Sequence, residues 1–93
     1  MNFPHWVDAP RSKKTRATNR LKYLLSVLAN NLTGRQSMRA LSEHVGLDHS
    51  TISIYIRRGA FSEKAAKLIE EKLGRAAVRH EQLTDPLSIE KTG

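Results

Sequence analysis

Residues 48–58, DHSTISIYIRR, hold the densest group of side chains able to do chemistry. Asp48, His49 and Ser50 are the three residue types of a hydrolase triad, but triad members meet through folding and cannot converge when they are adjacent on one helical turn. The histidines of the chain have no metal-ligand spacing, and no cysteine or carboxylate cluster accompanies them. There is no glycine-rich phosphate loop either. We therefore expect neither an enzyme nor a bound cofactor.

The elements that must position these residues follow a helical pattern. Leucines at i, i+3, i+4, i+7 and i+11 predict a first helix that begins after Thr18 or Asn19, either of which can cap it. A short second helix is predicted from a Ser37 cap to Val45. Gly46 ends it, because glycine adopts the left-handed conformation of a helix C-terminus without steric cost. The turn is too short for antiparallel helices, so the next helix should cross steeply.

Asp48 can cap that third helix, which continues to about Arg58. A fourth helix is predicted from Ser62 to a stop at Gly74, and a short helical or extended piece follows. The chain is therefore predicted to be all-α, a compact domain of four to five helices. The core-facing positions of the third helix, at helical spacing, are Ile52, Tyr55 and Ile56.

The charge of the 93-residue chain is +7, and residues 1–22 hold six Lys or Arg against one Asp. Such a charge attracts a polyanion, either nucleic acid or an acidic membrane surface, although cationic surfaces also keep small proteins soluble. Prolines and the lack of apolar periodicity predict a flexible basic arm over residues 1–16, before a domain at 17–84 and a frayed tail at 85–93. Phe3 and Trp6 should fold back onto the domain or meet a partner.

The cellular setting follows from two further features of the sequence. The absence of cysteine fits a reducing cytoplasm. The start lacks a basic region followed by an apolar run, and the most apolar stretch, YLLSVLA, is far too short for a membrane span. We therefore expect a soluble cytoplasmic protein that has no membrane partner.

The solvent-facing positions of the third helix are those left when its core face is subtracted: His49, Ser50, Ser53, Ile54 and Arg57. A protruding helix fits the DNA major groove, where each base pair presents a distinct pattern of donors, acceptors and methyl groups. We predict that these five side chains contact bases, the alternative being an ordinary solvated face. Further basic residues are predicted to contact phosphates, which set register and carry the salt dependence. They are Arg39, Arg58 and Lys64, with Arg11, Lys13, Lys14 and Arg16 of the arm.

The segment LSEHVGLDHSTISIYIRRG resembles the helix-turn-helix of Cro and repressor-type phage regulators. The longer run from Leu21 to Leu87 resembles the YdaS-type, Cro-like prophage regulators. Ser42 stands where the family most often has alanine, Tyr55 replaces a frequent tryptophan, and Ile54 takes a place often held by a polar or basic residue. The positions that carry the motif are Leu41, Ser42, Gly46, Leu47, Ile52 and Tyr55.

The resemblance implies a lambda repressor-like fold and a sequence-specific transcriptional regulator, a repressor of phage or prophage type. It also implies a homodimer on a pseudo-palindromic operator in double-stranded DNA. The apolar residues Val78, Leu83, Leu87 and Ile89 make residues 76–89, with the fourth helix, the expected dimer surface. Two alternatives stay open: an antitoxin-like module that grips a protein partner through the arm or the tail, and a non-specific nucleic-acid-binding protein.

Overall fold

The computed structural model describes residues 2–89, and every regular element in this range is helical. This confirms the all-α prediction, with six α-helices in the described range where the sequence predicted four to five. The elements are α1 (His5–Asp8), α2 (Lys13–Thr33), α3 (Met38–Val45), α4 (His49–Arg58), α5 (Glu63–Leu73), α6 (His80–Thr84) and the short 3-10 helix η1 (Pro86–Ser88).

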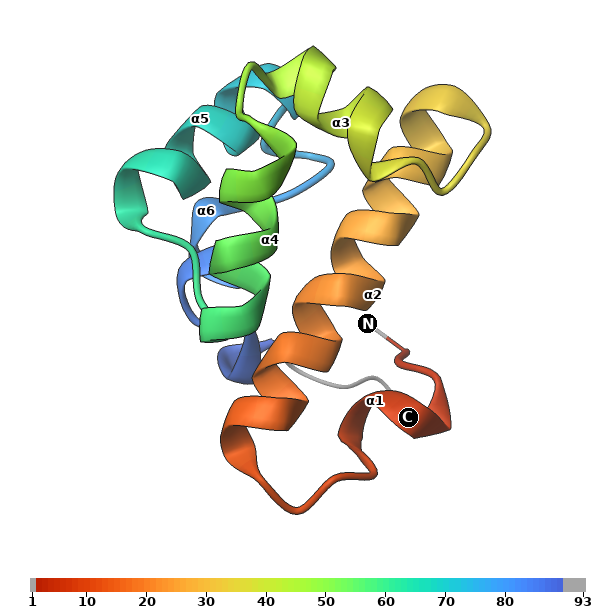
Figure 1. The fold of residues 1–93 in the computed structure, drawn as a ribbon, viewed down its shortest axis with the longest axis vertical. Coiled ribbons are helices and arrows are strands. Elements are labelled where there is room, and N and C mark those ends of the chain that lie inside the picture. The colour runs from red at the N-terminus through yellow and green to blue at the C-terminus, as the bar shows by residue number, and fades with distance from the viewer. Residues whose placement is uncertain (1, 90–93) are drawn as a thin grey trace.

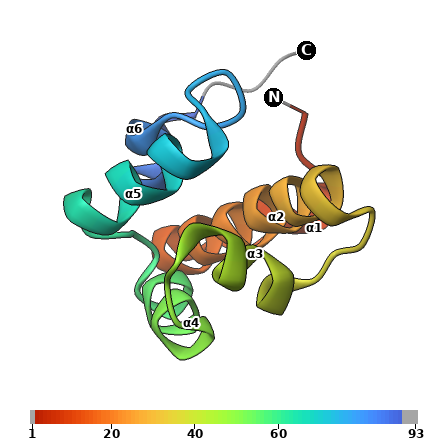
Figure 2. The same ribbon diagram turned by 90° about the horizontal axis from the view of Figure 1, so that it is seen from above.

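Helix α2 is the centre of the fold, and it contacts α1, α3, α4 and η1. Figure 2 shows α3 and α4 on one side of α2, with α5 and α6 on the other. Four leucines of the α2 stripe, Leu21, Leu24, Leu25 and Leu28, face into the core, where they meet residues of α3, α4, α5 and α6, whereas Leu32 at the end of the stripe is 38% exposed. Members of this core with at most 2% of their surface exposed are Leu21, Leu24, Leu25, Ala29, Leu41, Val45, Ile52, Ala66, Ile69, Val78 and Leu83.

The helix starts were predicted with mixed success. The hydroxyls of Ser37 and Ser62 accept hydrogen bonds from the third backbone N–H of α3 and α5, as expected for N-caps. Helix α2, however, begins at Lys13 with Ser12 as its cap, so the predicted start after Thr18 or Asn19 is wrong. Both residues lie inside the helix and use their side chains for tertiary hydrogen bonds, Thr18 to α4 and Asn19 to α1.

The prediction of a flexible arm over residues 1–16 is also wrong for the described part. Val7 in α1 is completely buried, and the Phe3 ring packs edge-on against Tyr23 with 5.8 Å between centroids. Residues from Lys13 onward belong to α2. A single helical turn such as α1 is too short to produce a periodic pattern, and tertiary contacts hold it in place.

The Arg20 side chain joins the N-terminal segment of the described chain to its C-terminal segment. Its guanidinium binds both carboxylate oxygens of Asp8, at 2.9 and 3.0 Å, and donates to the carbonyls of Pro86 and Ile89, both at 3.0 Å. The guanidinium carbon also lies 4.6 Å from the centre of the Phe3 ring. Arg20 is only 6% exposed, so these bonds replace the water that a buried charge loses.

The prediction of a frayed tail is wrong over residues 85–89, because Pro86 is buried and η1 packs against α2. Residues 90–93 lie outside the described residues. Val78 and Leu83 are at most 1% exposed and belong to the core of the chain itself. Of the four apolar residues on which the expected dimer surface at residues 76–89 was based, Leu87 is the exposed one, at 37%, and Ile89 is half-buried against the core, so this segment offers a partner less apolar surface than the sequence indicated.

Candidate nucleic-acid interface

Helices α3 and α4 are joined by a sharp turn at Gly46. The backbone of Gly46 is left-handed, with φ of 79°, and its N–H and that of Leu47 both donate to the Ser42 carbonyl, at 2.9 and 3.2 Å. Ser42 is buried, and its small side chain donates to the Arg39 carbonyl. In Figure 1, α3 runs across the top of the molecule and α4 descends from it, which agrees with the expected steep crossing.

Helix α4 is fixed along its inner face. Ile52 and Ile56 are buried, and the Tyr55 ring stacks on Phe61 with centroids 5.0 Å apart. The Ser62 hydroxyl donates to the Tyr55 hydroxyl at 3.1 Å. The inner face is therefore held both by the core and by the segment that leads into α5.

The C-terminal end of α4 is fixed to α2. The Thr18 hydroxyl donates to the Ile56 carbonyl at 2.8 Å. Gly59, with φ of 80°, ends α4 where it meets the first turns of α2: a Cβ at this position would lie 3.2 Å from the Ala17 Cβ and 3.6 Å from the Lys14 carbonyl oxygen. Contacts along one face and at the C-terminal end limit the freedom of α4 to tilt.

The outer face of α4 carries the five residues predicted to contact bases. At about 100° per residue they fall within roughly 140° of the helix circumference, so they form one continuous face. Ser53 is half-buried, the other four are exposed, and the Ser50 hydroxyl donates to the carboxylate of Asp48. Within the described part of the chain, the side chains of His49, Ser53 and Arg57 have no hydrogen bond or ion pair, so their polar groups are available to a ligand.

Three of the predicted phosphate contacts surround this face. Arg39, Arg58 and Lys64 are exposed, on α3, at the last residue of α4 and in the first turn of α5. Arg39 and His49 line the same open hollow of about 610 Å³ at the junction of α3 and α4. The acidic Glu43 and Asp48 line this hollow as well, so its charge is mixed, while Arg58 and Lys64 stand at and beyond the C-terminal end of α4.

The four basic residues of the predicted arm divide into two groups. Lys13 and Lys14 are exposed in the first turn of α2, and the backbone of Lys14 lies against Gly59 at the end of α4. Arg16, by contrast, donates to the carbonyls of Pro10 and Arg11 at 3.0 and 2.7 Å. Its guanidinium stabilises the bend before α2, whereas Arg11 is exposed within that bend.

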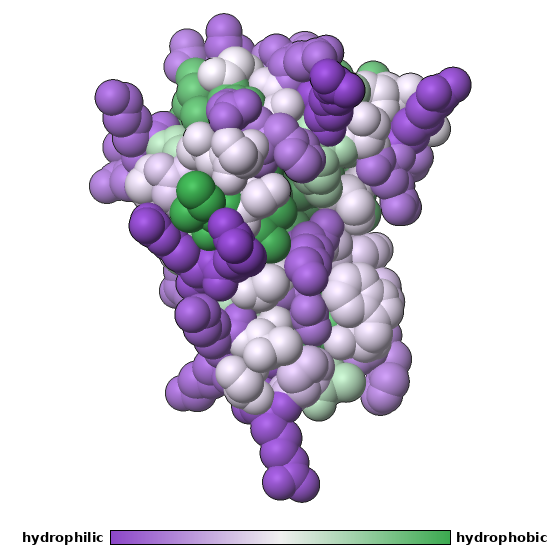
Figure 3. Space-filling model, in the orientation of Figure 1, coloured by the Kyte–Doolittle hydropathy of each residue, from purple (hydrophilic) through white to green (hydrophobic). Residues whose placement is uncertain are grey.

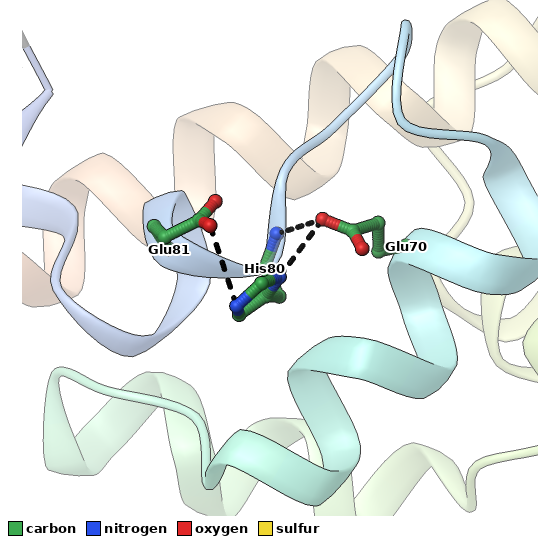
Figure 4. Close-up of side chains that lie close together, drawn as sticks. All are labelled: Glu70, His80 and Glu81. Atoms are coloured by element: carbon green, nitrogen blue, oxygen red, sulfur yellow. Dashed lines mark hydrogen bonds and ion pairs between the residues drawn. The ribbon is translucent and has the colours of Figure 1, made fainter.

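A cluster that the sequence analysis missed ties α6 to α5. His80 sits between two carboxylates: its Nδ1 lies 3.0 Å from Glu70 and its Nε2 lies 3.4 Å from Glu81 (Figure 4). The His80 backbone N–H also donates to Glu70, at 2.7 Å, and Arg75 forms ion pairs with both carboxylates. Nothing in the sequence marks the cluster, because the fold alone brings Glu70 to residues ten positions further on.

The charges of this cluster stabilise one another. The backbone N–H of His80, and after it the His80 ring, lower the pKa of Glu70 below its ordinary value of 4.5. The backbone N–H of Glu81 lowers the pKa of the Glu81 carboxyl group. Glu70, His80 and Glu81 are also residue types that bind metals, and their ligand atoms lie within 4.8 Å of one another. The two ring nitrogens point toward different carboxylates, Nδ1 toward Glu70 and Nε2 toward Glu81. The cluster forms a network of ion pairs.

Searches with this chain matched no family model, no curated protein and no solved structure. None of the helices in residues 2–89 is both long enough and apolar enough to cross a membrane. The function has to be inferred from the residues and their arrangement.

Proposed function

We propose that this protein is a sequence-specific DNA-binding regulator of the Cro-like type, in which α3 and α4 form a helix-turn-helix and α4 is the recognition helix. One observation carries the proposal. The outer face of α4 presents His49, Ser53 and Arg57 without partners inside the described chain, on a helix that is held along its inner face and at its C-terminal end. A rigid helix loses little conformational freedom on binding, which favours its use for recognition.

The side chains of this face match the chemistry of base edges. Arg57 can donate two parallel hydrogen bonds to the O6 and N7 atoms of a guanine. His49 and Ser50 lie in the first turn, and Ser53 stands one turn further on. Ile54, which is 40% exposed, offers an apolar contact to a thymine methyl group. A face of this composition can distinguish base pairs rather than merely attract phosphates.

The surrounding cations suit the sugar-phosphate backbone. Arg58 is exposed at the last residue of α4, and Arg39 and Lys64 are exposed on the adjoining α3 and α5. Lys13 and Lys14 extend the positive charge beyond the C-terminal end of α4. Arg11 can extend this positive charge along the bend before α2. Arg16 contributes less to phosphate binding, because its guanidinium already donates hydrogen bonds within the chain. Neutralising phosphates releases counterions, so affinity should fall steeply as the salt concentration rises.

The length of α4 requires two copies for a specific operator. Its ten residues extend about 15 Å at 1.5 Å per residue, which covers one segment of major groove. Helix-turn-helix proteins gain specificity by placing two recognition helices on half-sites about 34 Å apart. A dimer on a pseudo-palindromic operator would repress by covering promoter DNA. We propose no catalytic role, because the face holds no group activated for chemistry.

The proposal is tested by selecting binding sites from random duplex DNA with the purified protein at about 150 mM salt, where loose electrostatic binding is partly screened. We expect an enriched inverted repeat whose half-sites are centred about ten base pairs apart. Arg57→Ala should lower affinity for the selected site by about 1 to 3 kcal/mol and relax one position of it. Lys72→Ala is the matched control, because it removes an exposed cation at the far end of α5 from Lys64.

Two other outcomes would replace the proposal. Binding that falls with salt but selects no sequence would indicate the non-specific nucleic-acid-binding protein. A folded protein that binds no duplex and captures a stoichiometric protein partner would indicate the antitoxin-like module. Val7 and Arg20 fix residues 2–8 and 86–89 to the domain, but Trp6 is 50% exposed and Leu87 37% exposed, so both stay accessible to a protein partner.

A further inference from the structure

The ring of His80 lies between two carboxylates, and each of its nitrogens faces one of them (Figure 4). Nδ1 is 3.0 Å from the Glu70 carboxylate, which also accepts the His80 backbone N–H at 2.7 Å. These two contacts fix the ring from the side of α5. An ionised carboxylate can only accept hydrogen bonds, so the neutral ring carries its proton on Nδ1. Nε2 of the neutral ring is therefore an acceptor.

Nε2 and the Glu81 carboxylate then present two acceptors to each other, 3.4 Å apart. Two acceptors at this separation repel each other unless a proton or a metal ion lies between them. Two ligands bound at about 2.0 to 2.2 Å to one tetrahedral Zn²⁺ are about 3.3 to 3.6 Å apart, so the spacing suits a shared ion. Metal-binding histidines commonly donate their other ring N–H to a carboxylate, which is the place that Glu70 takes here.

The local charge also favours a cation at this position. The chain as a whole carries +7, and Figure 3 shows hydrophilic side chains over much of the face on which α4 lies. Around His80 the balance is reversed. Within residues 2–89, Glu70 and Glu81 share the guanidinium of Arg75, so a neutral His80 ring leaves one negative charge in excess. The Arg75 side chain is 60% exposed, so it can turn into solvent when an ion binds.

An open hollow gives an ion access to these two ligands. Its volume is about 420 Å³, and its lining comes from Phe61, Glu63, His80, Glu81 and Thr84. Glu63 adds a further carboxylate to the wall of the hollow. Zinc sites with an open position complete their coordination with water, which can enter here from the solvent.

We propose that Nε2 of His80 and the carboxylate of Glu81 bind one divalent transition-metal ion of the Zn²⁺ type, and that Glu70 is the positioning residue that holds the ring. Imidazole suits Zn²⁺, Cu²⁺ and Ni²⁺, whereas Mg²⁺ takes oxygen ligands. The ion lies at the start of α6, on the other side of α2 from α4 (Figure 2), so it leaves the outer face of α4 free. The site does not depend on the proposed function and is tested without DNA.

The experiment is calorimetric titration of the full chain with ZnCl₂ at about pH 8, where imidazole is mostly neutral. We expect one Zn²⁺ per chain, and H80N and E81Q should each lower its affinity at least about tenfold. E70A should lower it by about tenfold through the ring, and E70Q, whose amide oxygen can still accept from Nδ1, should restore most of it. R75A should raise the affinity, because the guanidinium no longer competes for the carboxylates. H44N, which removes an exposed histidine of α3, is the matched control and should change nothing.

Nuclear magnetic resonance of the histidine rings provides a measurement on the unaltered protein. Zn²⁺ should shift the ring signals of His80 before those of the other three histidines. In E70A the ring nitrogen shifts should show that the Nδ1–H tautomer is no longer the main one, a change that a merely structural role of Glu70 would not produce. Circular dichroism confirms that each variant is folded. The site is overturned if the His80 signals do not move up to about 1 mM Zn²⁺, if H80N binds like the wild type, or if Mg²⁺ binds as tightly as Zn²⁺.

Discussion

Replacing Arg20 by alanine removes a side chain that joins the N-terminal segment at Asp8 to the C-terminal segment at Pro86 and Ile89. The variant takes away two hydrogen bonds to the Asp8 carboxylate and one each to the carbonyls of Pro86 and Ile89. The side chains of Arg20 and Asp8 are only 8% and 13% exposed, so the carboxylate is left largely without water. We expect residues 2–12 and 85–89 to loosen together.

The size of the loss follows from this burial. Removing one partner of a buried ion pair costs about 3 to 5 kcal/mol. The free energy of unfolding of a 93-residue chain is about 5 to 14 kcal/mol, at roughly 0.05 to 0.15 kcal/mol per residue. R20A should therefore remove a large part of the stability. In a double-mutant cycle, R20A and D8A should be coupled by about 1 kcal/mol or more, since each removes the same pair.

Urea unfolding followed by two probes provides the measurement. Trp6 is the only tryptophan of the chain and lies in α1, so its fluorescence reports the docking of the N-terminal segment, while circular dichroism reports the helices as a whole. In the wild type the two transitions should coincide. In R20A both should move to lower urea, and the Trp6 transition should come first. An R20A protein with coincident transitions within about 1 kcal/mol of the wild type would show that the Arg20 network does not hold the ends of the chain.

Three further perturbations separate local from tertiary effects. Gly46→Ala should lower the free energy of unfolding in urea by about 1 to 2 kcal/mol, since its left-handed backbone disfavours a Cβ although no atom lies within 4 Å of one. Gly59→Ala should lower it by more, because the added Cβ also meets the Ala17 Cβ of α2 at 3.2 Å. Equal losses for the two variants would contradict this account. Because the pKa of Glu70 is lowered by folding, its contribution to stability is complete above pH 4.5 and is lost as the pH falls through the lowered pKa. Below pH 4.5 the thermal midpoint of E70Q should therefore fall less steeply with pH than the thermal midpoint of the wild type. Thr18→Val should cost about 0.5 to 1.5 kcal/mol in chemical unfolding by removing its bond to α4, and no loss would mean that this bond is dispensable.

The sequence allowed the helices around the α3–α4 turn to be predicted closely. Ser37, Gly46, Gly59 and Ser62 act through the backbone of their own or the next few residues, so their effect is readable without the rest of the molecule. The outer face of α4 was predicted by the same local logic, since helical periodicity alone separates the positions around Ile52 from those around Arg57. What that face binds remains a proposal.

The ends of the chain show what only the tertiary structure decided. Residues 2–12 look flexible in the sequence because they have no periodicity and contain prolines, and Thr18 and Asn19 look like caps because their short polar side chains often fill that role. In the folded protein those side chains bond to distant carbonyls, and Arg20 joins residues 12 positions before it to residues 69 positions after it. The Glu70–His80 pair arises in the same way. Local patterns determined where the helices around the turn begin and end, whereas contacts between distant residues decided that both ends are folded, because the bonds that hold them exist only once the core has formed.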